Sequence, residues 1–232
     1  MIIEVRAVAP FYKNGFVVAC GRTREAVVVD PGDEVDQLLG AVRDLDVEVQ
    51  AILLTHAHVD HITGVAAAKE AFEVPVYLHR DDQFLYDMAV QQGAMFGFKV
   101  RQPPPVDTYY DSTAISFGDY QARVHHTPGH CPGGVCLEVV EADLPAFAKA
   151  TADKQVGLSG IRHLFVGDTL FAGSIGRTDL PGGDYGVLMR SITEVLFALG
   201  DDAIVHPGHG PDTTIGRERS TNQFVLEYLR ST

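Results

Sequence analysis

Residues 51–65, AILLTHAHVDHITGV, restrict the fold of this chain more than any other stretch. An apolar run that is typical of a buried strand ends directly before a group of ligand-type side chains, His56, His58, Asp60 and His61. Histidine spacings of two and three do not fit one helical face, as the i, i+4 pair of HExxH does, but they fit a loop that leaves a strand. We therefore expect a buried strand whose end forms a site.

The spacing within this stretch predicts two pairs of ligands. On an extended or looped backbone the side chains at i and i+2 point the same way, so His56 and His58 can bind one ion together. Asp60 and His61, one step further along, can face a second ion nearby. Asp60 could instead cap the helix that is expected to begin near His61, but capping does not require three histidines. The stretch therefore favours a metal site.

Three more candidate ligands stand at the ends of other predicted strands: His130, Asp168 and His209. Each lies beside a glycine that lets the backbone turn tightly. Taken alone, Asp168 could be a turn residue and His209 a surface histidine. Taken with the first stretch, they complete the ligand set of a binuclear site. Nitrogen and oxygen ligands of this kind suit zinc, and iron or manganese would also be accommodated. We expect His56, His58 and His130 to bind one of two divalent ions, Asp60, His61 and His209 to bind the other, and Asp168 to bridge them.

The apolar periodicity of the whole chain predicts one α/β domain over residues 1–232. Each half runs from strands into helices, and this order predicts an αββα sandwich, in which two sheets pack face to face with helices outside. Three consecutive prolines at 103–105 place a surface loop across 97–111, and segment 141–162 is expected to be an insertion. We predict strands at 2–8, 16–20, 26–30, 51–55, 76–79, 114–117, 121–126, 135–140, 163–167 and 203–206, and helices at 33–45, 62–72, 80–92, 185–199 and 216–230.

Composition and charge argue against several classes of function. The formal charge of -13, without a basic stripe, opposes binding to nucleic acid or to an anionic membrane, so a small-molecule substrate is favoured. No apolar run approaches the roughly 18 to 20 residues that cross a bilayer, and the first residues lack a basic leader and a long apolar segment. We expect a cytoplasmic protein with reduced cysteines, and the formation of a homo-oligomer stays open.

Other catalytic patterns fit the sequence less well. The nearest match to a GxSxG nucleophile elbow is AGSIG, where Ala172 replaces the first glycine, and the chain has no Walker A or GxGxxG motif. Cys131 follows His130, but neighbours in sequence rarely face one another on a strand, so we interpret Cys131 as a buried thiol. We expect surface or supporting positions for the remaining histidines, His79, His125, His126, His163 and His206, among which His126 and His206 are the best candidates to support a ligand.

Five motifs occur in order along nearly the whole chain: THAHVDH, TPGHCPGG, GDTLF, GSIGRTD and PGHGP. Together they resemble the metallo-β-lactamase superfamily, and in particular its glyoxalase II-like hydrolases. The resemblance implies the αββα fold and the ligand assignment given above. It also implies hydrolysis of a thioester by a hydroxide that bridges two cations, which lower the pKa of a water molecule from 15.7 towards about 7. In this mechanism Asp60 orients the hydroxide as well as binding metal.

The resemblance also bears on the substrate. Glyoxalase II enzymes hydrolyse S-D-lactoylglutathione. They hold glutathione with a basic residue and a tyrosine after the bridging aspartate, a tyrosine after the last histidine, and a helical C-terminal domain. Here Arg177 matches the basic position, whereas Asp179 and Pro211 stand at the tyrosine positions, and the chain stops at Thr232. The chain is thus more similar to short, single-domain hydroxyacylglutathione hydrolase-like proteins. We expect Arg177 to bind a substrate carboxylate or, alternatively, to pair with Asp179 or Asp184.

Other functions stay open. Persulfide dioxygenases have a similar first motif and a GRTD element, as this chain does at 176–179, but they use one iron that two histidines and an aspartate hold. The chain could therefore be a mononuclear iron oxidoreductase. It could also hydrolyse another ester, a lactam or a phosphodiester, or bind metal without catalysis. Elemental analysis, a thioester assay and an oxygen-uptake assay separate these classes.

Overall fold

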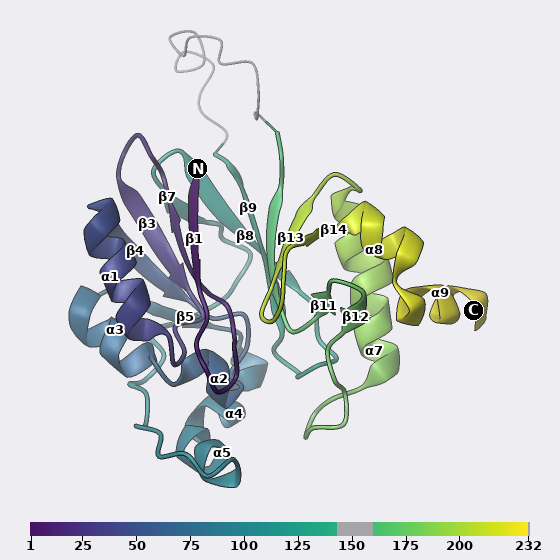
Figure 1. Cartoon of the computed structure of the whole chain (residues 1–232), viewed down its shortest axis with the longest axis horizontal. Coiled ribbons are helices and arrows are strands. Elements are labelled where there is room, and N and C mark those ends of the chain that lie inside the picture. The colour runs from purple at the N-terminus through teal and green to yellow at the C-terminus, as the bar shows by residue number, and fades with distance from the viewer. Residues whose placement is uncertain (143–159, 232) are drawn as a thin grey trace, which may run out of the picture.

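Two six-stranded sheets pack face to face in the computed structural model, which describes residues 1–142 and 160–231 (Figure 1). The first sheet follows the chain order from β1 to β6. Its first three strands are antiparallel, and the strands from β3 to β6 are parallel. The strands are β1 (Ile2–Arg6), β2 (Gly15–Ala19), β3 (Glu25–Val29), β4 (Glu48–Leu53), β5 (Val76–Leu78) and β6 (Thr108–Tyr109).

The second sheet has the strand order β14, β13, β10, β9, β8, β7. Its neighbouring strands are antiparallel except for β10 and β13, which are parallel. A separate hairpin of β11 (Leu170–Phe171) and β12 (Ser174–Ile175) follows β10. The strands of the second sheet are β7 (Ile115–Phe117), β8 (Tyr120–His126), β9 (Val135–Glu141), β10 (His163–Gly167), β13 (Ile204–Pro207) and β14 (Thr213–Thr214).

Helices cover the outer sides of both sheets, and this arrangement confirms the predicted αββα sandwich (Figure 1). The helices α1 and α3 lie outside the first sheet, α7 and α8 lie outside the second, and α2, α4 and α5 lie at the lower edge in this view. In the described residues no helix is both long and apolar enough to cross a membrane. The helices are α1 (Val35–Leu45), α2 (Val59–Ile62), α3 (Val65–Phe72), α4 (Gln83–Asp87), α5 (Ala89–Met95), α7 (Tyr185–Arg190), α8 (Ile215–Thr221) and α9 (Gln223–Ser231).

The alternation of side chains along a strand explains how the sheets are buried on both faces. On β2, Phe16 and Val18 point to the other sheet, and the ring of Phe16 lies 5.0 Å from that of Phe165 on β10. Val17, between them, points to the opposite face and packs in one cluster with Leu38 of α1. Because both faces of the strands are packed, the residues at the strand ends are held in fixed positions.

Two predicted helices are each divided by one residue with contacts to another part of the chain. The helix predicted at 62–72 is divided at Gly64, whose N–H donates to Pro31 O at 2.9 Å, and an added Cβ there would collide with backbone atoms. The helix predicted at 216–230 is divided at Asn222, whose side-chain amide donates to a carbonyl of β12 at 2.9 Å. The predicted continuous helices were wrong at these points because tertiary contacts override local periodicity.

The remaining differences concern short elements. The helix predicted at 80–92 is a 3₁₀ turn, η1 (Arg80–Asp82), followed by α4 and α5, which separate where Met88 leaves the α-helical region with φ -90° and ψ 14°. The helix predicted at 185–199 continues from α7 through a π-helical turn, η2 (Ser191–Val195), and a 3₁₀ turn, η3 (Leu196–Leu199). Strands of two residues carry no readable period, so β6, β11, β12 and β14 were missed. Most of the expected insertion at 141–162 lies outside the described residues.

Candidate metal centre

All seven predicted ligand residues lie together at one edge of the sandwich, where strands of both sheets end. Two of these strands, β10 and β13, are parallel neighbours, so their carboxyl ends meet at the same edge. The site thus combines one long motif with three single residues that are distant in sequence. His56 and His58 follow β4, Asp60 and His61 lie on α2, His130 follows β8, Asp168 follows β10, and His209 follows β13.

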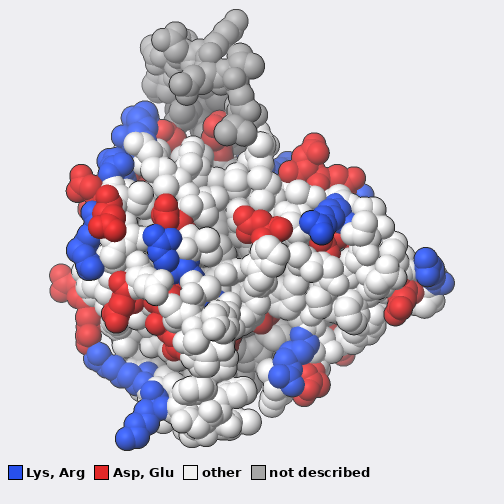
Figure 2. Space-filling model, in the orientation of Figure 1, with Lys and Arg blue, Asp and Glu red and all other residues white. Residues whose placement is uncertain are grey.

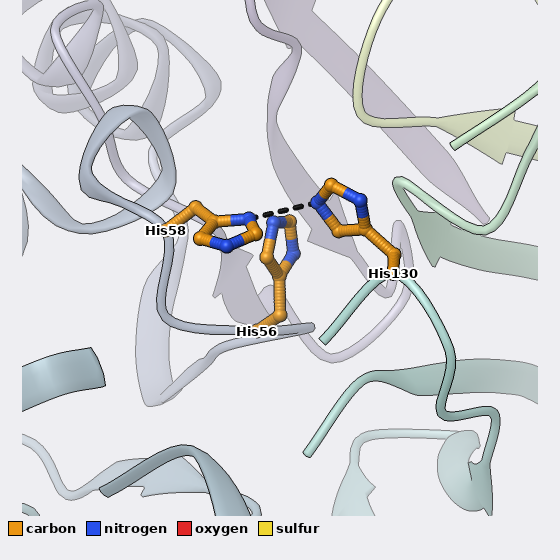
Figure 3. A group of neighbouring side chains, drawn as sticks. All are labelled: His56, His58 and His130. Carbon is orange, nitrogen blue, oxygen red and sulfur yellow. Dashed lines mark hydrogen bonds between the residues drawn. The ribbon is translucent and has the colours of Figure 1, made fainter. Parts of the chain in front are cut away.

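The first group of potential ligands is His56, His58 and His130, which are all buried (Figure 3). One nitrogen of each ring lies within 4.8 Å of the others, and His58 Nδ1 is 2.7 Å from His130 Nε2. His130 Nδ1 donates to Arg177 O at 2.8 Å, so in the neutral ring the proton is on Nδ1 and the lone pair of Nε2 points towards the group. Three imidazole nitrogens thus converge on one point, as a metal ion requires.

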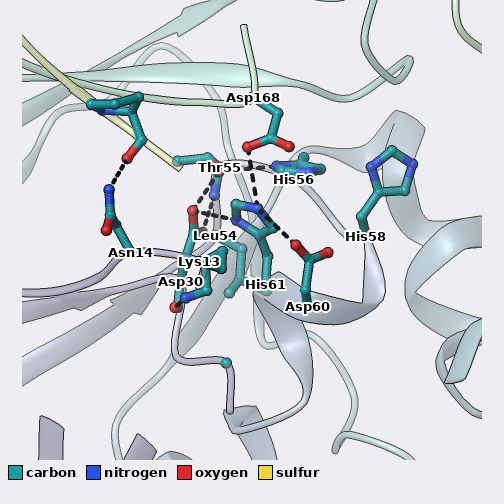
Figure 4. Close-up of polar contacts among 12 residues, drawn as sticks. Lys13, Asn14, Asp30, Leu54, Thr55, His56, His58, Asp60, His61 and Asp168 are labelled. Atoms are coloured by element: carbon teal, nitrogen blue, oxygen red, sulfur yellow. Dashed lines mark hydrogen bonds and ion pairs between the residues drawn. The ribbon is translucent and has the colours of Figure 1, made fainter. Parts of the chain in front are cut away.

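The second group is Asp60, His61 and His209. His209 Nε2 lies 3.1 Å from Asp60 Oδ2, and His61 Nε2 lies 3.7 Å from the same oxygen. Asp168 stands between the groups. Its Oδ1 is 3.4 Å from His61 Nε2 (Figure 4), and its Oδ2 is 3.7 Å from His130 Nε2. One carboxylate therefore faces a histidine of each group.

Unsatisfied polar atoms show that the donor set fits metal ions. In the described residues, four buried side-chain nitrogen and oxygen atoms have no hydrogen-bond partner, and three of them lie here: His56 Nε2, and the pair His61 Nε2 and Asp168 Oδ1, which lie 3.4 Å apart without forming a hydrogen bond. Each such atom costs about 1–3 kcal/mol if nothing compensates it. Divalent cations held by nitrogen and oxygen would satisfy all three atoms at once. The residues present therefore fit the two ions that the sequence predicts.

The charges of the site change the pKa of its members in opposite directions. Burial lowers the pKa of His61, but the charges of Asp60, Asp168 and Asp30 outweigh it and raise the pKa to about 10. Burial also lowers the pKa of His58, and neighbouring His130 lowers it further, to about 3. The acidic side of the site therefore attracts a positive charge at His61 Nε2, whereas His58 in the first group is a neutral donor.

Asp30, which the sequence analysis missed, orients one of the ligands. It follows β3 and is fully buried, and its Oδ2 accepts from His61 Nδ1 at 2.9 Å and from Thr55 Oγ1 at 2.6 Å. Because Nδ1 of His61 is a donor in this bond, Nε2 faces Asp60 and Asp168 with its lone pair when the ring is neutral. The signal for Asp30 was present, since it ends a predicted strand just as Asp168 does.

Asp82, also missed, joins the two loops of the first group. Its carboxylate is fully buried and accepts from Ala57 N at 2.9 Å, from Gly133 N at 2.6 Å and from Cys131 Sγ at 3.1 Å. Ala57 lies between two ligands, and Gly133 lies three residues after His130. Burial raises the pKa of Asp82, and burial also raises that of the Cys131 thiol, so the thiol stays protonated and supports this contact.

The loop that carries His209 is held by the turn before β2. Asn14 Nδ2 donates to Pro207 O at 3.0 Å and to Gly210 O at 2.8 Å, and Asn14 N donates to Gly208 O at 2.6 Å. Gly208 itself cannot be replaced without movement, because an added Cβ would lie 2.3 Å from Asp168 Oδ1. Close approach of this backbone therefore sets the distance between Asp168 and the second group.

Comparison with known proteins gives the family. Residues 8–144 match the family described as the metallo-beta-lactamase superfamily. The chain belongs to the metallo-β-lactamase superfamily. Superfamily membership agrees with the αββα fold, and it makes this chain one of a group of mainly hydrolytic, metal-binding enzymes.

Three relatives are similar over almost their whole length. Hydroxyacylglutathione hydrolase GloC of Haemophilus influenzae is 32% identical over 97% of this chain and 98% of its own. The crystal structure of the BLEG-1 B3 metallo-β-lactamase is 35% identical with a TM-score of 0.80, over 97% of this chain and 99% of its own. The structure of TTHA1623 in a di-iron-bound form is 37% identical with a TM-score of 0.77, over 95% of this chain and 99% of its own. These similarities support a glyoxalase II-like member of the superfamily.

The other five histidines of the chain are not among the seven predicted ligands. His126 Nε2 donates to Pro132 O at 2.8 Å and thereby supports the loop of His130, as expected. His206 is buried and lies 2.9 Å from His163 and 3.0 Å from Asp212, so it does not contact a predicted ligand. The other two, His79 and His125, also have partners. His79 stacks on His126 with ring centroids 4.1 Å apart, and His125 Nε2 lies 2.9 Å from Glu138 Oε2.

Arg177 makes the ion pair that the sequence analysis gave as an alternative. Its Nε and Nη2 donate to the two carboxylate oxygens of Asp179, both at 2.7 Å. The pair is exposed, and Arg177 lines a cavity of about 300 Å³ together with five of the predicted ligands: His58, Asp60, His130, Asp168 and His209. A substrate can therefore reach the ligand groups from this side.

Proposed function

We propose that this protein is a binuclear metallohydrolase of the glyoxalase II type, which hydrolyses S-D-lactoylglutathione or a related acyl thioester. The position of Asp168 carries the proposal, because its oxygens lie within 3.7 Å of histidines from both ligand groups. The similarity to GloC and to the di-iron-bound structure supports it. We propose zinc as the metal, and iron and manganese as the other metals that these donors accept.

The proposed ligands divide as the geometry groups them. When bound, the two ions would lower the pKa of a shared water molecule from 15.7 towards about 7 and polarise the substrate carbonyl. The first ion would be held by His56 Nε2, His58 Nδ1 and His130 Nε2, the second by Asp60, His61 Nε2 and His209 Nε2, and Asp168 would contact both.

The residues of the chain have separate tasks in this reaction. Burial raises the pKa of Asp60, but His61 and His209 lower it more strongly, so Asp60 is ionised at neutral pH and can orient the attacking water by accepting a hydrogen bond from it. A protein nucleophile is not needed. Cys131 is buried and its thiol pKa is raised well above the ordinary value, so it does not supply one.

Elemental analysis and two assays test the proposal together. We expect about two metal equivalents per chain, hydrolysis of lactoylglutathione or another thioester, and no oxygen uptake. One iron per chain with oxygen consumption on a persulfide would replace the proposal with the oxidoreductase. Metal binding without turnover of any thioester, ester, lactam or phosphodiester would replace it with a metal-binding role.

Lactam hydrolysis is the second candidate function. The observation that favours it is the similarity to the BLEG-1 structure, which is 35% identical with a TM-score of 0.80. A lactam carbonyl requires the same attack by water and the same stabilisation of the oxyanion as a thioester does. A chromogenic cephalosporin, assayed beside the thioesters with the same metal-loaded sample, decides between them by the ratio of kcat/KM values.

A further inference from the structure

The entrance to the ligand groups is apolar. One wall of the cavity is formed by Phe84 on α4, Met88 between α4 and α5, and Phe96 after α5. Leu180 and Pro181, in the loop after β12, also line the cavity. The same cavity is lined by the predicted ligands His130, Asp168 and His209. A substrate whose carbonyl lies at the ligands therefore has its adjoining atoms against these apolar side chains.

The apolar side chains of this wall are exposed to solvent. Phe84 is 42% exposed, Met88 44%, Phe96 50% and Met95, which also lines the cavity, 77%. Large exposed apolar groups that gather in one place mark a binding site, and methionine in particular adapts its shape to a ligand. In Figure 2 the surface at the lower edge, over α5, is mostly white, which means that few charged side chains lie there.

The charge of the arginine that lines the cavity is already compensated. Arg177 is the one Lys or Arg among the described residues that line it, and it is paired with Asp179 through two hydrogen bonds. A neighbouring cavity shares Phe11 and Val59 with the first and is lined by two other cations, Lys99 and Arg101, of which Arg101 is paired with Glu70. The apolar walls of this cavity would thus receive an uncharged, apolar part of a substrate.

We infer that the substrate has an apolar group of several carbons directly beside its scissile carbonyl, which packs against Phe84, Met88 and Phe96. This inference rests on the proposed thioester hydrolysis and narrows its substrate class. A cavity of about 300 Å³ is at the small end for ligand sites, which suits a short alkyl or a single aromatic group. The lactoyl group, with its hydroxyl, leaves most of this apolar surface without contacts.

Two series of thioesters locate the apolar group on either side of the carbonyl. In the first, the acyl chain grows from acetyl to octanoyl on one uncharged thiol. In the second, the acyl group stays acetyl and the thiol carries a growing alkyl chain. We expect kcat/KM to rise about fourfold per methylene in one of the series until the cavity is full. No dependence on chain length in either series would overturn the inference.

Two phenylalanine variants with similar exposure test whether the dependence of kcat/KM on chain length arises at this wall. Phe84→Ala should reduce the increase in kcat/KM per methylene by at least half, because it removes part of the wall. Phe224→Ala is the control, since Phe224 on α9 is 43% exposed and does not line the cavity. In Phe224→Ala we expect kcat/KM to increase by the same factor per methylene as in the unchanged protein. An equal loss in both variants would contradict the assignment to this wall.

Calorimetry with thioether analogues, which are not hydrolysed, separates this inference from the proposed function. The metal-loaded protein should bind a longer alkyl thioether more tightly, by about fourfold per methylene. If binding strengthens but no thioester is hydrolysed, the apolar site stands and the proposed reaction is wrong. If thioesters are hydrolysed but neither binding nor kcat/KM depends on alkyl length, the reaction stands and the inference is wrong.

Discussion

Replacing Asp82 tests whether one buried carboxylate holds the first ligand group in shape. Asp82→Ala removes the acceptor of two buried backbone N–H groups, those of Ala57 and Gly133, and the partner of the Cys131 thiol. Each buried N–H that loses its acceptor costs about 1–3 kcal/mol, so the two together should lower the free energy of unfolding by about 2–6 kcal/mol. That is a large part of the about 5–15 kcal/mol that stabilises an ordinary protein.

The same replacement should weaken metal binding, because the two joined loops carry His56, His58 and His130. Loss of a residue that orients metal ligands typically lowers metal affinity about 10- to 100-fold. Urea unfolding followed by circular dichroism measures the stability, since the chain has no tryptophan to report on unfolding. Competition with a chelator measures the affinity for the more weakly held ion.

Two further variants make the Asp82 experiment decisive. Asp82→Asn keeps one acceptor oxygen, so its free energy of unfolding should fall by about half as much as that of Asp82→Ala. It therefore supplies a folded protein for the measurements if Asp82→Ala does not fold. Asp81→Ala is the control, because Asp81 is the adjacent exposed residue and its carboxylate lies no closer than 3.8 Å to His79. Unfolding of Asp82→Ala at the same urea concentration as Asp81→Ala, with equal metal affinity, would refute the role given to Asp82.

Three other outcomes follow from the site. Asp168→Ala should lower metal content and hydrolysis together, by more than about 100-fold in kcat/KM, and retention of both metals with full activity would show that the ligand division is wrong. His61 has a pKa raised from 6.5 to about 10, so it stabilises metal-stripped protein fully below pH 6.5 and this contribution is lost as the pH rises through about 10. Urea unfolding of stripped protein and of His61→Gln at pH 6, 8 and 10 should show a difference that shrinks with pH, and a constant difference would contradict this. Asp179→Asn should lower KM for a thioester with a carboxylate several-fold, because it releases Arg177, whereas an unchanged KM would show that Arg177 does not contact this carboxylate.

The fold and the position of the predicted ligands could be anticipated because each rests on a local pattern. Apolar strands can be recognised from their periodicity, and ligand-type residues within four residues of the ends of four of them had to meet once the strands formed two packed sheets. The same rule applied to Asp30, which ends the strand predicted at 26–30, but the Pro31 and Gly32 that follow it made it resemble an ordinary turn residue.

Asp82 could not be found in this way. In the sequence it stands in RDDQF, at the start of a predicted helix, where an aspartate is ordinarily exposed. Its burial depends on contacts with Ala57, 25 residues earlier, and with Gly133, 51 residues later. The break at Asn222 has the same origin, since its amide bonds to Ser174, 48 residues away. Single residues whose role depends on such distant partners have no signature in local periodicity.

The segment from η1 to α5 connects metal binding with substrate choice. Asp82, at the end of η1, holds the loops of the first ligand group, and Phe84 and Met88, two and six residues further on, form the apolar wall of the cavity. The strands that carry the ligands are packed on both faces and tolerate little change. The exposed side of α4 and α5 has no such restriction. Replacement of Phe84 or Met88 should therefore change which acyl or thiol group is accepted while metal content stays the same, whereas replacement of Asp82 should change both.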